Sequence, residues 1–227
     1  IHVIIPNMRI QKYLSEQKVC SRREAEVYIT KGLVKVNGVV VTNLATQIDP
    51  AVDKIELDPS LLKSQQEKIT IAIHKPRGVI SSPELLPKQY QHLNSVGRLD
   101  KESEGLLLLS NDGAITASVT GADHTIEKEY EVTVRERVTD SKLAKMASGI
   151  NLEDGITLPA RTKAIDDTNF RIILREGRNH QIRRMCEAMH LTVVSLKRLR
   201  IGRIVLGDLK PGMYRILSEK EVAFLKQ

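Results

Sequence analysis

Several residue types are scarce in this chain of 227 residues. It contains no tryptophan, five tyrosines and two phenylalanines, which disfavours an open aromatic platform on which single-stranded nucleic acid could stack. Its two cysteines, Cys20 and Cys186, lie far apart and have no metal-ligand spacing. Such sparse cysteine excludes a disulfide scaffold and favours a reducing, cytoplasmic location. The sequence has no apolar run of about 18 residues, so it predicts no membrane-spanning helix and no membrane partner.

Positive charge, by contrast, is in excess. Lys and Arg number 35 against 28 Asp and Glu, which gives a formal net charge of +7. Residues 8–40 hold seven basic groups against three acids, and residues 171–215 hold eleven against three. A solvated surface and an anionic partner both explain such stretches. Arg22 and Arg23 favour the anionic partner, because cations in the first turn of a helix are unfavourable unless an anion such as phosphate compensates them.

The first part of the chain, residues 8–58, has the pattern of a small module of two helices and a hairpin. Ser21 and Glu24 have the spacing of a capping box, in which each side chain binds the other residue's backbone N–H at the start of a helix. Asn37 and Gly38 stand between two short runs of valines, and this pair is typical of a two-residue hairpin turn.

A domain boundary is expected after this module. The composition, 41% hydrophobic and 28% charged, is that of a globular protein, and the length accommodates a small domain plus a larger one. Residues 63–68 are polar and lack periodicity, which is typical of a linker. We therefore expect domains at residues 1–66 and 67–227.

The second domain alternates irregularly between strand and helix patterns. Strands are predicted at residues 69–75, 106–109, 126–134, 170–174, 193–196 and 201–206, and helices at residues 139–147, at 182–189 and from Ser218 onward. Several of the connections are short enough for hairpins. The predicted fold class is α+β, with the helix-and-hairpin module followed by a mixed, mostly antiparallel sheet and flanking helices.

One segment carries candidate chemistry. Between Gly97 and Gly105 stand three acids at alternating positions, Asp100, Glu102 and Glu104. They can form a charged surface loop, a carboxylate site for a hard ion such as Mg²⁺, or a setting for one catalytic carboxylate. The metal site is disfavoured, because no other segment supplies the remaining ligands convincingly. In the third case the two glycines would let backbone and substrate approach the carboxylate closely.

The order of the motifs resembles that of a known family, the RNA pseudouridine synthases, and in particular the branch that modifies ribosomal RNA and has an N-terminal S4 RNA-binding domain. The resemblance covers nearly the whole chain and is carried by residues 8–58, 74–79, 97–113, 128–130 and 176–185. One departure is the stretch between Ser82 and Leu85, which is shorter than is usual in the family.

This resemblance implies an isomerase that needs no metal and no organic cofactor. The glycosidic bond of a uridine breaks, the base rotates, and C5 bonds to C1′ in place of N1. Asp100 is then the catalytic nucleophile, attacking either C1′ of the sugar or C6 of the base. The sequence does not distinguish these two points of attack.

Three further residues receive roles beside Asp100. Arg183 is expected to pair with Asp100 and hold it ionised, because a guanidinium keeps its charge when desolvated; its alternative is a solvent-facing position, which suits Arg184 better. Tyr130 is expected against the target base, and its alternative is an ordinary core tyrosine. Arg98 is expected to fill the gap left by a flipped uridine, and its alternative is a structural ion pair.

Other basic residues are expected to bind RNA. Lys75 either supports the active-site loop or contacts phosphate. The remaining candidates for RNA binding are Arg9, Arg22, Arg23, Lys31, Lys35, Arg178 and Arg184. His74 and His180 are interpreted as structural, because the chemistry gives them no required role.

The expected partner is ribosomal RNA, with 23S favoured, as naked RNA or within a pre-ribosomal particle, and the protein is expected to be a monomer. Three alternatives remain open. One is a synthase for small-subunit rRNA or tRNA, and another is a non-catalytic RNA-binding factor for ribosome assembly. The third is a Mg²⁺-dependent nuclease that would use Asp100, Glu102 and Glu104.

Overall fold

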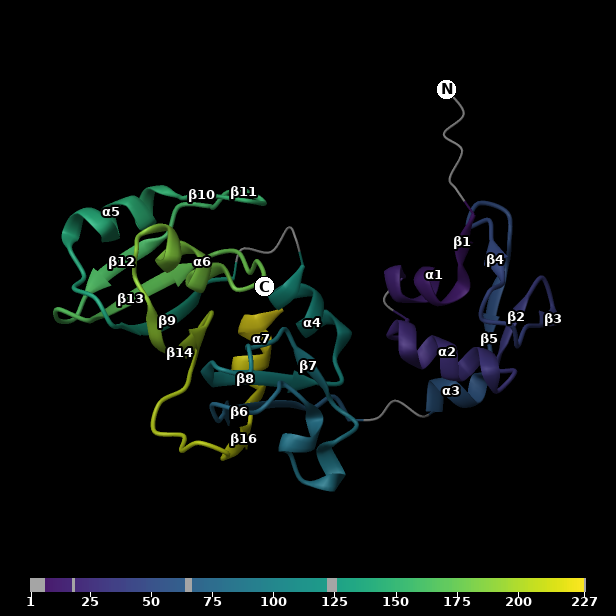
Figure 1. Ribbon diagram of the computed structural model, residues 1–227. Helices are drawn as coiled ribbons and strands as arrows, with labels where there is room; N and C mark the ends of the chain where they lie inside the picture. The colour runs from purple at the N-terminus through teal and green to yellow at the C-terminus, as the bar shows by residue number, and fades with distance from the viewer. Residues whose placement is uncertain (1–6, 18, 64–66, 122–125, 227) are drawn as a thin grey trace. The chain divides into compact units, whose positions relative to one another are not determined.

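The structure is a computed structural model that describes residues 7–17, 19–63, 67–121 and 126–226 (Figure 1). The chain divides into two compact units, residues 1–68 and 69–227. Part of the predicted linker, residues 64–66, lies outside the described residues. None of the helices in the described ranges is both long and apolar enough to span a bilayer. Cys20 and Cys186 are free thiols, and burial raises the pKa of Cys186 to about 12.

The N-terminal unit contains short helices and strands. Its helices are α1 (Ile10–Glu16), α2 (Arg22–Thr30) and α3 (Pro59–Lys63), and its strands are β1 (Met8–Arg9), β2 (Val34–Val36), β3 (Val39–Val40), β4 (Gln47–Ile48) and β5 (Ile55–Leu57). Strands β3, β2 and β5 form one sheet, and β1 pairs with β4. The core consists of Ile10, Leu14, Ala25, Ile29, Val34 and Ile48, all nearly or fully buried.

Local sequence signals explain this unit. The capping box at the start of α2 is present: Ser21 Oγ accepts from the Glu24 N–H, and a Glu24 carboxylate oxygen accepts from the Ser21 N–H at 2.8 Å. Asn37 and Gly38 both have positive φ, as the predicted hairpin turn between β2 and β3 requires. Strand β5, which the sequence did not predict, adds a third strand along β2.

The C-terminal unit is built on one large sheet. Its strands are β6 (Thr70–Lys75), β7 (Asn94–Val96), β8 (Glu104–Ser110), β9 (Lys128–Val134), β12 (Arg161–Ala164), β13 (Asn169–Leu174), β14 (Val193–Ile201), β15 (Ile204–Val205) and β16 (Tyr214–Ile216), and β10 (Asn151–Leu152) and β11 (Gly155–Ile156) form a separate hairpin. Its helices are α4 (Gly113–Thr120), α5 (Asp140–Ser148), α6 (Gln181–Ala188) and α7 (Glu219–Leu225), with 3-10 turns at Pro83–Leu85 and Lys88–Tyr90.

The strand order in the large sheet is β12-β13-β9-β14-β8-β6-β16, with β15 paired to β14 and β7 to β8. The pair of β14 with β8 is parallel, and the other strand pairs given for this sheet are antiparallel. The expectation of a mixed, mostly antiparallel sheet with flanking helices is confirmed.

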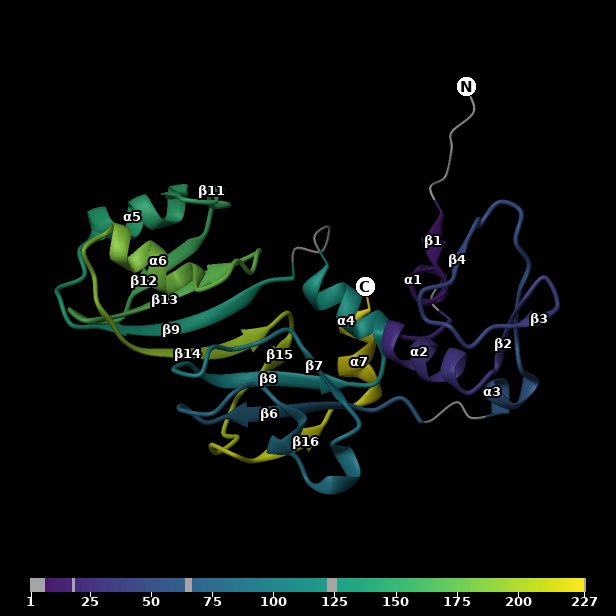
Figure 2. The same ribbon diagram turned by 45° about the vertical axis from the view of Figure 1, so that its right-hand side comes forward.

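Helices cover the two faces of the sheet at different ends. Figures 1 and 2 show α5 and α6 together over β9, β12 and β13, where Val132, Phe170 and Ile172 pack against them. Alternate residues of β8 serve two separate cores. Leu106 and Leu108 pack with the side of α4 and α7, whereas Leu107 and Leu109 pack against the loops that follow β6. The middle of the sheet, where these layers meet, positions the site described below.

One strand prediction was wrong. Residues 193–196 and 201–206 were expected to form separate strands, but β14 runs without a break from Val193 to Ile201 and is followed by the two-residue strand β15. The charged pair Lys197 and Arg198 interrupts the hydrophobic pattern, yet Arg198 is a buried position of the strand with 3% of its surface exposed.

Candidate active site

The loop that bears Asp100 connects β7 to β8. Lys75, at the end of β6, contacts this loop from the interior of the protein. Lys75 is completely buried. Its ammonium donates to the carbonyl oxygens of Pro76 at 3.0 Å, Val79 at 2.7 Å and Lys101 at 3.5 Å. One buried side chain therefore ties the turn after β6 to the residue that follows Asp100.

This position favours the loop-supporting role of Lys75 over phosphate contact. The side chain has no exposed surface, and its ammonium is engaged by carbonyl oxygens. Burial lowers the pKa of Lys75 from its ordinary value, and the nearby carboxylates of Asp100, Glu102 and Glu104 oppose that shift.

Two more contacts hold the residues just before Asp100. Ser81 Oγ accepts from the N–H of Leu99 and donates to its carbonyl oxygen, both at 2.9 Å. Arg198, buried in β14, donates through Nε to Leu106 O at 2.7 Å and through Nη1 to Arg98 O at 3.5 Å. The sequence analysis did not single out Ser81 or Arg198, although both fix the loop.

Gly105 lies where two strands of the sheet approach each other closely. Its φ is +108°, and a Cβ at this position would stand 2.6 Å from the backbone nitrogen of Arg198, closer than real Cβ atoms approach. Gly105 therefore lets β8 and β14 pair closely. The expected close approach of a substrate is not needed to explain it.

The carboxylate of Asp100 is bracketed by two side chains of α6 and its N-cap. Arg183 Nε lies 3.8 Å from Oδ2, and His180 Nε2 lies 3.4 Å from Oδ1. Arg183 Nη2 also donates to Glu102 O and to Ser103 Oγ, each at 3.2 Å. The Asp100 side chain keeps 35% of its surface exposed, so it is accessible to an incoming nucleotide.

His180 was interpreted as structural, and its position beside Asp100 was missed. It is the N-cap of α6 with φ of 48°, in the left-handed region. The turn residues from Gly177 onward predict that a helix begins here. A helix pattern does not reveal a contact with a loop that is distant in the sequence. His74, in contrast, is 3% exposed and its Nδ1 lies 2.7 Å from Leu209 O, a structural position.

Tyr130 lies in β9 on the face that α5 and α6 cover, half-buried between two hydrophobic clusters. It pairs in register with Arg198, which in turn pairs with Gly105. Tyr130 is thus two strands from the end of the Asp100 loop, roughly 10 Å across the sheet.

Two arginines expected to bind RNA are occupied within the protein. Arg178 donates to Glu176 and to the backbone of the β10–β11 hairpin, including Ile156 O at 2.6 Å. Arg184 binds both carboxylate oxygens of Asp154, at 2.8 and 3.0 Å, and holds the pKa of Asp154 near 2. Both residues connect the hairpin to the region of α6. Most of their hydrogen-bond donors are therefore engaged within the protein, and few remain for RNA.

The other candidates for RNA contact are accessible. Arg98, two residues before Asp100, is exposed. The five candidates in the N-terminal unit are exposed as well: Arg9, Arg22, Arg23, Lys31 and Lys35. They lie on β1, at both ends of α2 and on β2, so the N-terminal unit carries its positive charge on several elements.

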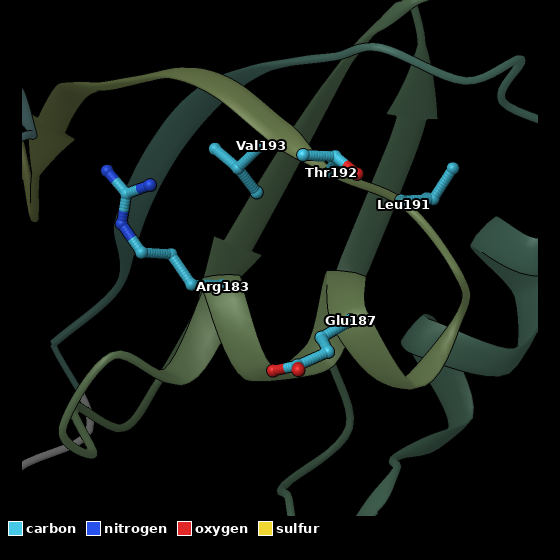
Figure 3. Close-up of a pocket in the computed structure, with 5 residues that line it drawn as sticks. All are labelled: Arg183, Glu187, Leu191, Thr192 and Val193. Carbon is cyan, nitrogen blue, oxygen red and sulfur yellow. The ribbon is translucent and has the colours of Figure 1, made fainter.

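The three acids of the loop do not form a metal cluster. Among the residues that the structure describes, no group of three or more His, Cys, Asp or Glu side chains is arranged to hold a metal ion. Glu102 instead pairs with Arg77 at 3.4 Å. A cavity of about 250 Å³ is lined by Arg183 and Glu187 of α6 and by residues 191–193. Figure 3 shows these side chains as sticks. Asp100 is not among the lining residues.

The mixed sheet, the supported carboxylate loop and the basic N-terminal unit together define an RNA-modifying enzyme. Residues 69–188 match the family of RNA pseudouridylate synthases, and residues 8–52 match the S4 domain. The chain belongs to the RNA pseudouridylate synthase family and is an RNA pseudouridine synthase with an N-terminal S4 domain.

Similar proteins cover nearly the whole chain. An uncharacterized RNA pseudouridine synthase of Aquifex aeolicus is 37% identical over 96% of this chain and 93% of its own length. The dual-specificity RNA pseudouridine synthase RluF of Escherichia coli is 34% identical over 95% of this chain and 77% of its own length. A crystal structure of a pseudouridylate synthase superposes with a TM-score of 0.73 at 32% identity, covering 96% of this chain and 99% of the other.

Proposed function

We propose that this synthase isomerises a uridine of ribosomal RNA, with 23S rRNA favoured, and that Asp100 is its nucleophile. The observation that carries the proposal is the contact of Asp100 with Arg183, on a loop that Lys75 and Arg198 fix from inside the protein. An exposed carboxylate on a loop without function would not need these buried supports.

The proposed chemistry conserves every atom of the uridine. Asp100 attacks C1′ or C6, the N1–C1′ bond breaks, and the base rotates so that C5 faces the sugar. A C5–C1′ bond forms, Asp100 is released, the C5 proton leaves, and N1 gains a proton. Nothing is oxidised or reduced, so no redox cofactor is required. Arg183, which lies beside Oδ2 of Asp100, would hold the carboxylate in place for this attack.

Tyr130 and Arg98 complete the proposed site. The ring of Tyr130, which is half-buried in β9, would pack against the target base, and its hydroxyl would assist removal of the C5 proton. A uridine in folded RNA must leave its stack, which costs a few kcal/mol. The exposed guanidinium of Arg98 would take its place, because a planar cation can stack on bases and contact phosphate.

The exposed basic residues of the S4 unit are proposed to dock RNA. They are Arg9, Arg22, Arg23, Lys31 and Lys35. The substrate is proposed to be 23S rRNA, free or within a pre-ribosomal particle, and the enzyme to act as a cytoplasmic monomer. A second RNA is a specific alternative, since the E. coli relative carries the description dual-specificity. Small-subunit rRNA and tRNA are therefore tested beside 23S rRNA.

A chemical map of pseudouridine tests the proposal. Transcripts of 23S rRNA, 16S rRNA and tRNA are treated in chelator with the wild-type protein or with Asp100→Asn. We expect one or a few new sites with the wild type and none with Asp100→Asn, whose RNA affinity stays close to that of the wild type. Modification by both proteins would show that Asp100 is not the nucleophile. Modification confined to 16S rRNA or tRNA would overturn the 23S assignment. If naked RNA is bound but not modified, the same map is made with a pre-ribosomal particle as the substrate.

A further inference from the structure

We infer that His180 is a positioning residue for the reaction: it holds Oδ1 of Asp100 while Arg183 holds Oδ2, so that the carboxylate is fixed in orientation before uridine enters. The inference rests on the proposed nucleophilic role of Asp100. It assigns a function to a side chain for which the isomerisation chemistry has no requirement.

The two contacts come from the start of α6. His180 is the N-cap and Arg183 is the third residue of the helix, so both side chains belong to its first turn. Nε2 of His180 lies 3.4 Å from Oδ1 of Asp100, and Nε of Arg183 lies 3.8 Å from Oδ2. Such contacts are often long in a substrate-free enzyme and tighten when the substrate is bound.

Contact at both oxygens limits a motion that contact at one oxygen leaves free. A carboxylate bound through Oδ2 alone can still rotate about its Cβ–Cγ bond, because this terminal torsion is broad. A second donor at Oδ1 fixes the plane of the carboxylate relative to α6. For a nucleophile, this orientation matters directly, since misplacement of a reacting atom lowers the rate of the chemical step.

The backbone of His180 supports a functional role. Its φ of 48° and ψ of 28° are left-handed, which is uncommon for residues other than glycine. Two other residues among those described share a positive φ without being glycine. Asn37 lies in the hairpin turn, and His190 lies just beyond the end of α6. His180 is the N-cap of α6 but its side chain makes no capping bond. The imidazole points to Asp100, whereas the side chain of a capping residue would bind the first N–H groups of the helix.

The two oxygens of Asp100 have different partners. Arg183 lies at Oδ2 and His180 at Oδ1. The guanidinium of Arg184, the next residue along α6, binds Asp154 instead.

Two substitutions test the donor at Oδ1. Gln carries an amide N–H that can approach the place of Nε2, and Ala removes the donor. We measure kcat and KM for His180→Gln, His180→Ala and the wild type on one modified RNA fragment. His92→Gln is the matched control, because His92 is exposed and lies outside the site.

We expect His180→Ala to lower kcat about tenfold with KM changed less than twofold, the loss expected when the contact tightens to one hydrogen bond with a charged group in the RNA complex. We expect His180→Gln to retain most of kcat. His92→Gln should match the wild type throughout.

Two results would overturn the inference. A raised KM with unchanged kcat would assign His180 to an RNA phosphate, and kinetics equal to the wild type in both variants would remove its role. The proposed function fails separately, by activity of Asp100→Asn. If Asp100→Asn is inactive and both His180 variants behave as the wild type, the nucleophile stands and only the positioning role is lost.

Discussion

The guanidinium of Arg183 lies 3.8 Å from the carboxylate of Asp100 and at the same time donates to the backbone carbonyl of Glu102, two residues further along the loop. The Arg183 side chain thus contacts the charged group of Asp100 and also fixes the backbone that follows Asp100. This double contact explains why an arginine suits the position: its donors lie in a fixed plane and reach several acceptors at once.

Removal of this guanidinium should slow the chemical step. We expect Arg183→Ala to lower kcat about tenfold to a hundredfold, because it removes the cation beside Asp100 and the two hydrogen bonds to the loop that follows. Arg183→Lys should fall between Ala and the wild type, because one ammonium cannot reach Asp100, Glu102 O and Ser103 Oγ together. Single-turnover rates on saturating RNA measure the effect. Wild-type rates for Arg183→Lys would show that charge alone is sufficient.

Lys75 should matter for stability before it matters for RNA binding. Lys75→Met leaves the carbonyl oxygens of Pro76 and Val79 without their buried donor, and we expect a loss of about 2–4 kcal/mol in the free energy of unfolding. Urea denaturation, followed by a probe in the C-terminal unit, measures this free energy for each variant. The control is Lys101→Met, since the Lys101 side chain is exposed on the same loop and should change little. Equal midpoints for both variants would contradict the supporting role.

Much of this fold could be predicted from the sequence, because its signals are local. The capping boxes at Ser21 and Ser218 mark helix starts that the structure has at the same residues. The turn at Asn37 lies where glycine-like backbone angles were expected. The apolar run at residues 106–109 is a fully buried strand, as its flanking residues indicated.

The features that the sequence does not reveal depend on contacts between distant segments. Arg198 is a charged residue that is nevertheless buried, and backbone carbonyls of another strand and a loop accept its hydrogens. Arg178 and Arg184 resemble an RNA-binding pair, but Asp154 in an unpredicted hairpin engages both. His180 faces Asp100 through a left-handed backbone conformation, for which the helix pattern gives no signal.

The close pairing of β8 with β14 gives a sharp test at Gly105. Gly105→Ala introduces a Cβ that meets the backbone of Arg198 and forces a residue with a side chain to φ of +108°. We expect a loss of at least about 2 kcal/mol in the free energy of unfolding, because backbone cannot move aside as a side chain can. Gly113→Ala is the control: it begins α4, and no atom lies within 4 Å of its added Cβ. Similar thermal midpoints for the two variants would contradict the close approach.

The hairpin formed by β10 and β11 should detach from α6 in acid before the protein unfolds. Asp154 binds Arg184 through both carboxylate oxygens and Arg178 through one, and these guanidiniums lower its pKa from 3.8 to about 2. A carboxyl group whose pKa is lower in the folded state contributes stability that is complete above its unfolded pKa. The contribution therefore holds above about pH 4 and disappears as pH falls toward 2.

Hydrogen exchange of the hairpin amides measures this detachment. In the wild type, corrected for the intrinsic pH dependence, protection of residues 151–156 should fall between pH 4 and 2, while the amides of β8 stay protected until global unfolding. In Asp154→Asn, protection of the hairpin should already be low at pH 7 and change little with acid, because no carboxylate remains to be protonated. Asp208→Asn, on an exposed loop, should behave as the wild type. Full protection of the hairpin in Asp154→Asn at pH 7 would mean that the backbone bonds from Arg178 to Gly155 and Ile156 hold it unaided.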